Sequence, residues 1–406
     1  MLLTAGMGAG HDRVAQEIRR RLAGRGIDTE ILDVWDLLPC RLGWVITVFY
    51  KTIIGYAPWI YEGIYTIWLR PGERGRRRTS PLIRLAGRRL RRWMAANRPA
   101  AAVSTFHLCS QVLGDMRRRN MMAVPTASIV VDFAAHGLWV DPDVDVHFCL
   151  HDSQAQRVRS LGAPRVEAPG PVVSPAFSRP GITRAEARSH LGLDLGEPTV
   201  LVVAGSWGAG RIERTARAIA AGGRFHPVLV AGRNDKLRRQ LEAAGCGRVL
   251  GWVDDMAMLM TASDVVVENA GGLMAMEAMA LGIPVVSFDP IPGHGRENAA
   301  RMEEAGVSRY ARSQEGLLRI MDRLLDDEGY REHLTGTASA MFRSDVADRI
   351  ADMVHRPEQM DTDPITDCKV SDQRRTTWAV VGRSVRLAKG RSRAAAQVVR
   401  KRALSG

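Results

Sequence analysis

The sequence lacks several features that would assign it to a particular class of protein. It has no run of about 18 uncharged apolar residues, so it contains no obvious membrane-spanning helix. No charged segment followed by an apolar stretch stands at its start, and we therefore expect no signal peptide. The five cysteines are scattered without a CxxC pair, which argues for free thiols in a reducing cytosol rather than a disulfide framework or a zinc site.

Acidic residues are nearly missing from two long basic stretches of a chain whose net charge is +13. Residues 70–98 hold eleven arginines and one acid, Glu73, and residues 374–402 hold ten Lys or Arg and no acid. Basic segments bind nucleic acid or anionic membranes. Since no nucleic-acid-binding motif accompanies them, we expect an anionic membrane surface and no nucleic acid as partner. The alternative is a set of ordinary solvated arginines.

Apolar runs alternate with helical patterns along 406 residues, a length sufficient for two domains. Amphipathic helices are predicted at Asp12–Leu22 and Leu82–Ala96, and a Pro/Gly-rich linker at residues 168–181. The chain is therefore predicted to be α/β, with two doubly wound parallel-sheet domains at 1–172 and 182–352 and a polar connector and basic tail at 353–406. The predicted strands are Leu2–Thr4, Glu30–Val34, Ala101–Phe106, Ala127–Phe133, Val146–Leu150, Val200–Ala204, Val228–Ala231, Val249–Trp252, Val265–Val267 and Val285–Phe288.

The most informative segment is residues 265–298, which read as a strand, a Gly-Gly turn, a helix, a second strand and a Pro/Gly loop. The turn at Gly271–Gly272 lets a ligand approach the backbone, and the free N–H groups of the helix start point at an anion. Glu277 lies one turn into that helix, where a carboxylate can accept hydrogen bonds from the two hydroxyls of a ribose. Together these features suggest a nucleotide diphosphate site.

The same segment resembles the donor-binding signature of GT-B glycosyltransferases related to MurG and to the monogalactosyldiacylglycerol synthases. Their pattern is roughly GGLT-x-x-EA-x-A-x-G-x-P, followed by a PGQE-type loop and an Asn. The resemblance implies two Rossmann-like domains facing a cleft, with the diphosphate on Gly271, Gly272 and Leu273 and the ribose on Glu277. It also implies a UDP-sugar as donor, no metal and no cofactor. The matching positions are Gly271, Gly272, Leu273, Glu277, Ala278, Gly282, Pro284, Pro292, Gly293 and Asn298.

Three further strand ends in the second half match the family in order and spacing. The loop AGSWGAG at 204–210 resembles its phosphate-approach loop, AGRN at 231–234 a CGRN-like pattern, and GWV at 251–253 the segment that faces the uracil. Taken singly, each is a common strand-end turn. The donor residues that the resemblance adds are Gly205, Ser206, Gly232, Arg233, Trp252, Val253, His294 and Asn298.

Three positions in two motifs depart from the family pattern. Met274 replaces the usual Thr, so a hydroxyl that would face the diphosphate is missing. His294 and Gly295 replace the Gln and Glu of the PGQE loop, whose side chains hold hydroxyls of the transferred hexose. A site discriminates between sugars by such bonds. The departures thus leave room for another sugar, acidic or N-acetylated, or for a weakened or inactive homologue.

The glycine-rich segment AGMGAGH at 5–11 resembles the GGGH or GxGH loop of the diacylglycerol glycosyltransferases. Gly8 and Gly10 would form the turn on the acceptor side. His11 would be the general base, because an imidazole titrates near neutral pH. The alternatives are a histidine that only holds the loop, and a dinucleotide-binding turn, although the spacing is not GxGxxG.

Residues 131–150 resemble the family's TD-x-x-x-x-H-x-x-W segment, with Asp132, His136 and Trp139 in register. Asp132 follows a strand and is expected either to orient His11 or to act as the base itself. The alternative is that it only caps a helix or stabilises a turn. His136 is assigned to the acceptor side, and Trp139 to packing. The DxDxD spacing of Asp141, Asp143 and Asp145 is interpreted as a turn around Pro142, so no metal is assigned.

Residues 44–69 carry eight of the 23 aromatic residues of the chain. Aromatic rings followed by a basic run are typical of a protein that binds at a bilayer interface. Trp59, Tyr65 and Trp68 are therefore predicted to contact the acceptor or the membrane, the alternative being core packing.

We expect an inverting transferase that moves a hexose, galactose or glucose, from a UDP-sugar to the lipid acceptor diacylglycerol. It would be cytoplasmic and peripheral at the inner face of the cell membrane. The alternatives are a related enzyme acting on a polyprenyl lipid or a small metabolite, a UDP-sugar 2-epimerase, and a non-catalytic nucleotide-sugar or lipid sensor.

Overall fold

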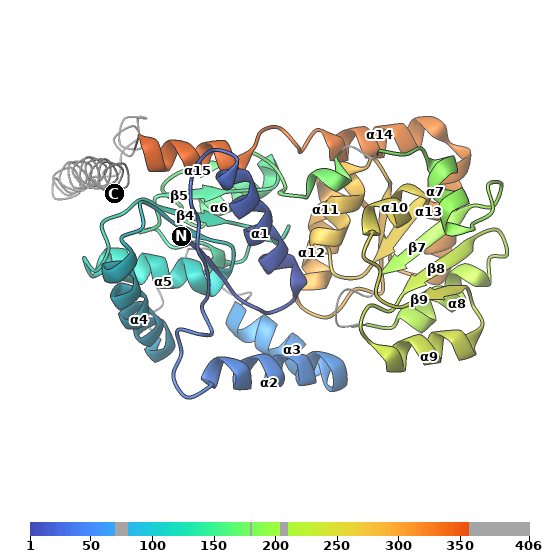
Figure 1. Ribbon diagram of the computed structural model, residues 1–406. Helices are drawn as coiled ribbons and strands as arrows, with labels where there is room; N and C mark the ends of the chain where they lie inside the picture. Colours follow the sequence, from blue (N-terminus) through green and yellow to red (C-terminus); the bar gives the residue numbers. More distant parts are fainter. Residues whose placement is uncertain (70–79, 179–180, 204–209, 357–406) are drawn as a thin grey trace, which may run out of the picture.

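The computed structural model describes residues 1–69, 80–178, 181–203 and 210–356. Within these ranges the chain forms two six-stranded parallel sheets, in the orders β2-β1-β3-β4-β5-β6 and β12-β11-β10-β7-β8-β9. Helices cover both sheets, and the two halves lie side by side (Figure 1). The predicted α/β fold with two doubly wound sheets is confirmed. Several predicted features lie outside the described residues: the donor residues Gly205 and Ser206, the part of the first basic stretch at 70–79, and the second basic stretch at 374–402.

The first half is built from short strands, and the inner strands β1, β3, β4 and β5 are buried because helices cover both faces of the sheet. Its strands are β1 Leu2–Thr4, β2 Ile31–Asp33, β3 Ala102–Ser104, β4 Thr126–Ile129, β5 Val146–Phe148 and β6 Val166–Glu167. Its helices are α1 Ala9–Ala23, α2 Leu42–Tyr56, α3 Pro58–Ile64, α4 Pro81–Asn97, α5 His107–Arg118 and α6 Asp152–Ser160. Shorter turns are the π-helix η1 Tyr65–Leu69 and the 3-10 helices η2 Gly137–Trp139 and η3 Pro175–Phe177.

The second half repeats the alternation of strand and helix. Its strands are β7 Thr199–Val203, β8 His226–Val230, β9 Arg248–Leu250, β10 Val265–Glu268, β11 Val285–Phe288 and β12 Arg309–Ala311. Its helices are α7 Arg184–Leu191, α8 Ile212–Ala220, α9 Asp235–Ala244, α10 Met256–Thr261, α11 Leu273–Ala280, α12 His294–Glu304, α13 Gln314–Asp326 and α14 Glu328–Ser339.

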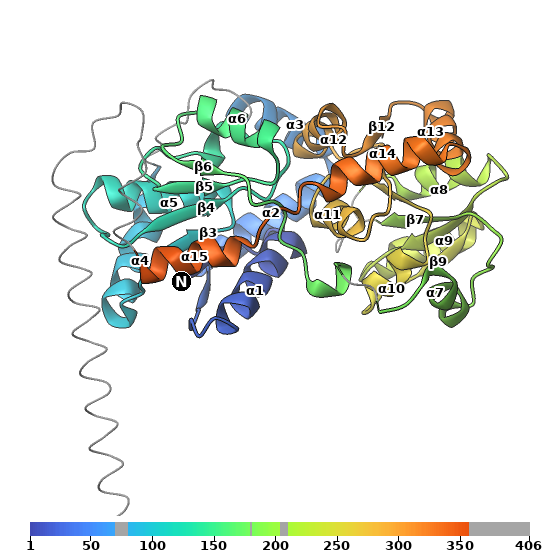
Figure 2. The same cartoon turned by 90° about the horizontal axis from the view of Figure 1, so that it is seen from above.

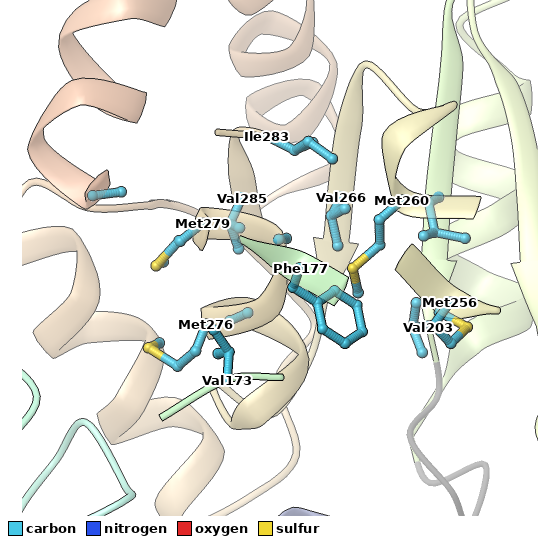
Figure 3. Packing of buried hydrophobic residues seen from close by; sticks show 14 of the residues in the cluster. Val173, Phe177, Val203, Met256, Met260, Val266, Met276, Met279, Ile283 and Val285 are labelled. Carbon is cyan, nitrogen blue, oxygen red and sulfur yellow. The ribbon is translucent and has the colours of Figure 1, made fainter. Parts of the chain in front are cut away.

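The segment predicted as a linker is anchored in the second half. Val173 and Phe177 are buried in a cluster with Met256, Met276 and Val266, so the chain between the halves is pinned by apolar packing (Figure 3). Burying a side chain of this size stabilises by roughly 1.5–3 kcal/mol.

The last described helix, α15 (Val346–His355), returns to the first half and spans residue 353, where the connector was predicted to begin. Ile350 packs with Val14 of α1, and the Asp345 carboxylate accepts a hydrogen bond from Arg21 at 2.9 Å. Figures 1 and 2 both show α15 over the first sheet, away from α13. An amphipathic helix buries its apolar face against whichever element offers a matching stripe, and here α1 supplies it.

Candidate active site

A cavity of about 270 Å³ lies between the two halves, at the carboxyl ends of their strands. Parallel α/β sheets bind ligands at this edge. Residues of both halves line this cavity. The first half contributes Gly8, Gly10, His11, Arg13, Tyr50 and Asp132, and the second contributes Gly232, Trp252, Val253, Glu268, Gly272, Leu273, Met274, Ile291 and His294.

The first turn of α1 brings His11 to this cavity. The turn from β1 passes through Gly8, whose φ of 118° disfavours any other residue. His11 Nδ1 lies 2.9 Å from the carbonyl oxygen of Thr105. Because a carbonyl oxygen only accepts, Nδ1 donates in this contact, so the neutral His11 ring has its lone pair on Nε2. This is the tautomer that a general base acting through Nε2 requires.

Asp132 also lines the cavity, a few residues after β4. Its Oδ2 accepts a hydrogen bond from Trp139 Nε1 at 3.3 Å, which gives Trp139 a definite role in orienting the carboxylate. His136 is 6% exposed, and its Nδ1 accepts from Leu138 N, so it caps η2 behind the site. The structure therefore brings Asp132 to the cavity and leaves His136 in the supporting layer.

The three aspartates with DxDxD spacing are held by arginines. Asp145 pairs with Arg117 at 2.7 Å and Asp143 with Arg118 at 2.7 Å, while Asp141 Oδ1 accepts from Asp143 N. Burial raises the pKa of Asp141 to about 6. Within the described ranges, no three His, Cys, Asp or Glu side chains are grouped as metal ligands would be.

The Gly-Gly turn between β10 and α11 is organised by Glu268, which the sequence reasoning missed. Its Oε2 accepts hydrogen bonds from the backbone N of Ala270 and of Gly271, and its Oε1 accepts from Ser287 Oγ. Burial raises its pKa, against the effect of these hydrogen bonds. An acid directly after a buried valine run was the signal available in the sequence. Among the described side chains none caps α11, so its first N–H groups remain for an anion.

Asn298, which was predicted to bind the donor, makes contacts between the two halves in the structure. The side chain is fully buried, with Oδ1 accepting from Ala134 N at 2.8 Å and Nδ2 donating to Ala270 O at 3.0 Å. Both polar atoms are thus used by the backbone of the two halves. Asn298 therefore ties the Gly271–Gly272 turn to the first half.

Glu277 lies beside the main cavity rather than in its lining. It faces a second hollow whose wall shares Arg13 and Leu273 with the main cavity. Oε1 lies 3.8 Å from Arg13 Nη1, and Oε2 has no hydrogen-bond partner among the described residues. Burial raises the pKa of this carboxyl to about 7, and the charge of Arg13 partly opposes the rise.

Comparison with known families matches each half of the chain to a glycosyltransferase model. Residues 11–173 match the family model of monogalactosyldiacylglycerol (MGDG) synthase, and residues 187–341 match that of glycosyl transferases group 1.

The chain belongs to the GT-B glycosyltransferases of the MurG and monogalactosyldiacylglycerol synthase type.

Relatives of this GT-B enzyme cover most of its length. It is 23% identical over 348 residues to the processive diacylglycerol beta-glucosyltransferase of Bacillus pumilus, covering 81% of this chain and 87% of the relative. Acinetobacter baumannii MurG has the same fold, with a TM-score of 0.56 and 16% identity over 88% of this chain and 98% of the other. Anabaena Alr3699/HepE in complex with UDP superposes with a TM-score of 0.51 and 15% identity, over 87% and 98% of the two chains.

In the GT-B chain the expected uracil side lies where β8 and β9 end. Gly232, with φ of 61°, and Trp252 and Val253 line the cavity. The guanidinium of Arg233 lies over the Trp252 ring at 4.2 Å, and Trp252 Nε1 donates to Asp254. Arg233 therefore contacts the cavity wall through the Trp252 ring.

The loop that departs from the GT-B pattern is bound by α3 and η1 of the first half. Gly293 N donates to Glu62 Oε2 at 2.7 Å, and His294 Nδ1 lies 2.8 Å from the hydroxyl of Tyr61. Burial lowers the pKa of His294. A side chain at position 295 would meet Ile291 Cγ1 at 2.6 Å, which explains the glycine there.

Part of the aromatic segment packs inward, including Tyr65, which was predicted to contact the acceptor or the membrane. That side chain is 2% exposed, and its hydroxyl donates to Glu297 Oε2 at 2.7 Å, so it joins the halves and does not face a membrane. The Trp68 side chain lies outside what the structure describes. Trp59 is 73% exposed. Trp44 and Phe49 on α2 are also largely exposed.

Helix α4 also presents arginines to solvent. Residues of both α2 and α4 pack on one core cluster of the first half. No helix among the described residues is long and apolar enough to cross a bilayer. The exposed arginines of α4 are Arg84, Arg88, Arg91 and Arg92.

Proposed function

We propose that this GT-B protein transfers a hexose, galactose or glucose, from a UDP-sugar to the hydroxyl of diacylglycerol. The observation that carries the proposal is the hydrogen bond of His11 to the Thr105 carbonyl, which leaves Nε2 as a base in a cavity shared by both halves. The relatives named as diacylglycerol glucosyltransferases support the acceptor class, and the fold shared with a UDP complex supports the donor class.

In the proposed reaction the acceptor oxygen attacks the anomeric carbon while its proton passes to His11 Nε2. The bond from that carbon to the diphosphate oxygen breaks, and UDP leaves with the electron pair. Attack opposite the leaving group inverts the anomeric carbon, as the family resemblance implies. Asp132, held by Trp139, lies on the same wall and would stabilise the imidazolium that forms.

The donor would lie on the second half. The free N–H groups at the start of α11 would bind the diphosphate, and Glu277 would accept hydrogen bonds from the ribose hydroxyls. Gly232, Trp252 and Val253 would enclose the base.

We also propose that the enzyme acts at an anionic membrane surface, on the cytoplasmic side. Trp44, Phe49 and Trp59 would enter the interface, and the α4 arginines would meet anionic headgroups. Such attraction is screened by salt.

The test is transfer from UDP-glucose, UDP-galactose and UDP-N-acetylglucosamine to diacylglycerol in anionic vesicles, read by mass spectrometry of the lipid extract. A hexosyl-diacylglycerol with matching UDP release is expected. Transfer only to a polyprenyl lipid or a small alcohol would replace the acceptor. Conversion of the donor without acceptor would identify an epimerase, and UDP binding without turnover would identify a sensor.

A further inference from the structure

Two helices that face each other across the halves begin at the same cavity. An ideal Cβ on Gly10 of α1 would lie 3.7 Å from Leu273 Cβ of α11, an ordinary van der Waals distance. Arg13 comes one turn after Gly10, and Glu277 comes one turn after Leu273. The ion pair between their side chains is therefore the next contact along two adjacent helices.

Arg13 is placed so that it can serve either of two partners. Its side chain is 38% exposed and lines both the main cavity and the hollow that holds Glu277. At 3.8 Å the contact with Glu277 is a loose ion pair rather than a hydrogen bond. Because its partner is distant and its side chain is partly exposed, Arg13 can leave Glu277 for another anion.

We propose that Arg13 is a positioning residue that holds Glu277 in the empty enzyme and moves to the donor diphosphate once the ribose has taken Glu277. This role rests on the proposed function, because it assigns a residue to the same donor site.

The exchange follows from the chemistry of the groups. The ribose hydroxyls donate to Glu277, so they compete with Arg13 for the same carboxylate. A displaced guanidinium then lies beside the start of α11, where the diphosphate would sit. There it can make charge-assisted, bidentate contacts with phosphate oxygens. A cation at that place also stabilises the negative charge that grows on UDP as it leaves.

The test compares uridine with UDP, because the two ligands differ only in the diphosphate. Binding is measured by titration calorimetry for the wild type, Arg13→Met and Arg13→Lys, and for Arg19→Met, an exposed arginine on the same helix that does not line the cavity. In Arg13→Met the affinity for UDP should fall about 10- to 100-fold, the strength of a hydrogen bond to a charged group. The affinity for uridine should stay equal or rise. Arg13→Lys should recover part of the UDP affinity, and Arg19→Met should match the wild type.

The outcomes separate the two proposals. One outcome is that Arg13→Met keeps the wild-type ratio of UDP to uridine affinity, for example by raising both affinities by the same factor. In that case Arg13 only shields Glu277, and its diphosphate role is overturned. If the wild type binds neither ligand, the donor assignment itself fails, and the role of Arg13 fails with it. Thermal melting of each variant verifies that it is folded.

Discussion

The two walls of the cavity differ in the kind of group that they present. The first half contributes side chains that change charge or carry it, namely His11, Arg13 and Asp132. The second half contributes mainly backbone and apolar surface, such as Gly272, Val253 and Met274. Its one buried acid at the turn, Glu268, is already satisfied by the turn itself.

This difference suggests that the first wall carries out proton transfer and the second wall binds the ligand. Backbone N–H groups and apolar walls bind a ligand by shape and fixed dipoles, and they need no change of protonation. Proton transfer requires a titratable side chain with a lone pair, and His11 on the first wall has one. Substitutions on the two walls should therefore have different kinetic signatures.

The largest effect is expected from His11→Ala. Removing the base should lower the rate of transfer by about 10²–10⁴, while UDP affinity should stay near that of the wild type, because the proposed donor site lies on the other wall. Initial rates and calorimetry measure the two quantities. A variant with near-normal turnover would remove His11 from the role of base.

Glu277, which lies beside the second wall rather than in it, should make binding of the donor pH-sensitive. Ribose hydroxyls donate to the ionised carboxylate, so uridine affinity should rise as pH increases through the pKa of about 7. Between pH 6 and 8 we expect a change of roughly tenfold. Glu277→Gln should show a flat profile, and an equally sloped profile would show that another group controls binding.

The same carboxyl should also affect stability. Its folded pKa of about 7 lies above the ordinary value of 4.5, so between these values the folded state holds more protons than the unfolded state. The free energy of unfolding should consequently fall as pH rises across this window, by at most about 3 kcal/mol. Urea unfolding of the wild type and Glu277→Gln should diverge above pH 5 and agree at pH 4. Parallel curves would contradict the burial of an uncompensated carboxyl.

Asn298→Ala should loosen the connection between the walls. It leaves the buried Ala134 N and Ala270 O without their partner, which should cost about 2 kcal/mol of the free energy of unfolding. As control, the exposed Asn97 on α4 bonds only its own helix, and Asn97→Ala should change stability by less than about 0.5 kcal/mol. Equal stabilities for the two variants would remove the proposed tie.

The smallest effect is expected on the outer surface. Trp59→Ser should weaken binding to anionic vesicles by roughly tenfold, because one large apolar side chain no longer enters the interface. Leu195→Ser, at a 62% exposed position in the second half, is the matched control and should bind like the wild type. Cosedimentation at low salt measures both. Equal binding of the two variants would assign the membrane surface elsewhere.

Local sequence was sufficient for most of the fold. Ten strands were predicted from apolar runs, and each has a counterpart in the structure, because a strand buried on both faces must be apolar along its length. The strands β6 and β12 were not predicted. Both are short, lie at the edges of their sheets and carry no apolar run: β6 is Val166–Glu167 and β12 is Arg309–Ala311.

The candidate site was predictable where one short segment carries both the turn and the side chain. His11 follows its glycine turn directly, and Gly271, Gly272 and Glu277 share one strand-turn-helix unit, so spacing alone could identify them. The directions in which Tyr65 and Asn298 point were not predictable, because each meets its partners across the two halves.

The sequence by itself thus determined the class of fold, the two glycine turns and the order of the donor motif, since these depend on periodicity and backbone freedom within a few residues. Only the tertiary structure decided that Arg13 meets Glu277, that Asn298 joins the halves and that α15 returns to the first sheet. Those contacts join residues far apart in the chain. They depend on how two packed sheets and their helices fit together, which no local pattern encodes.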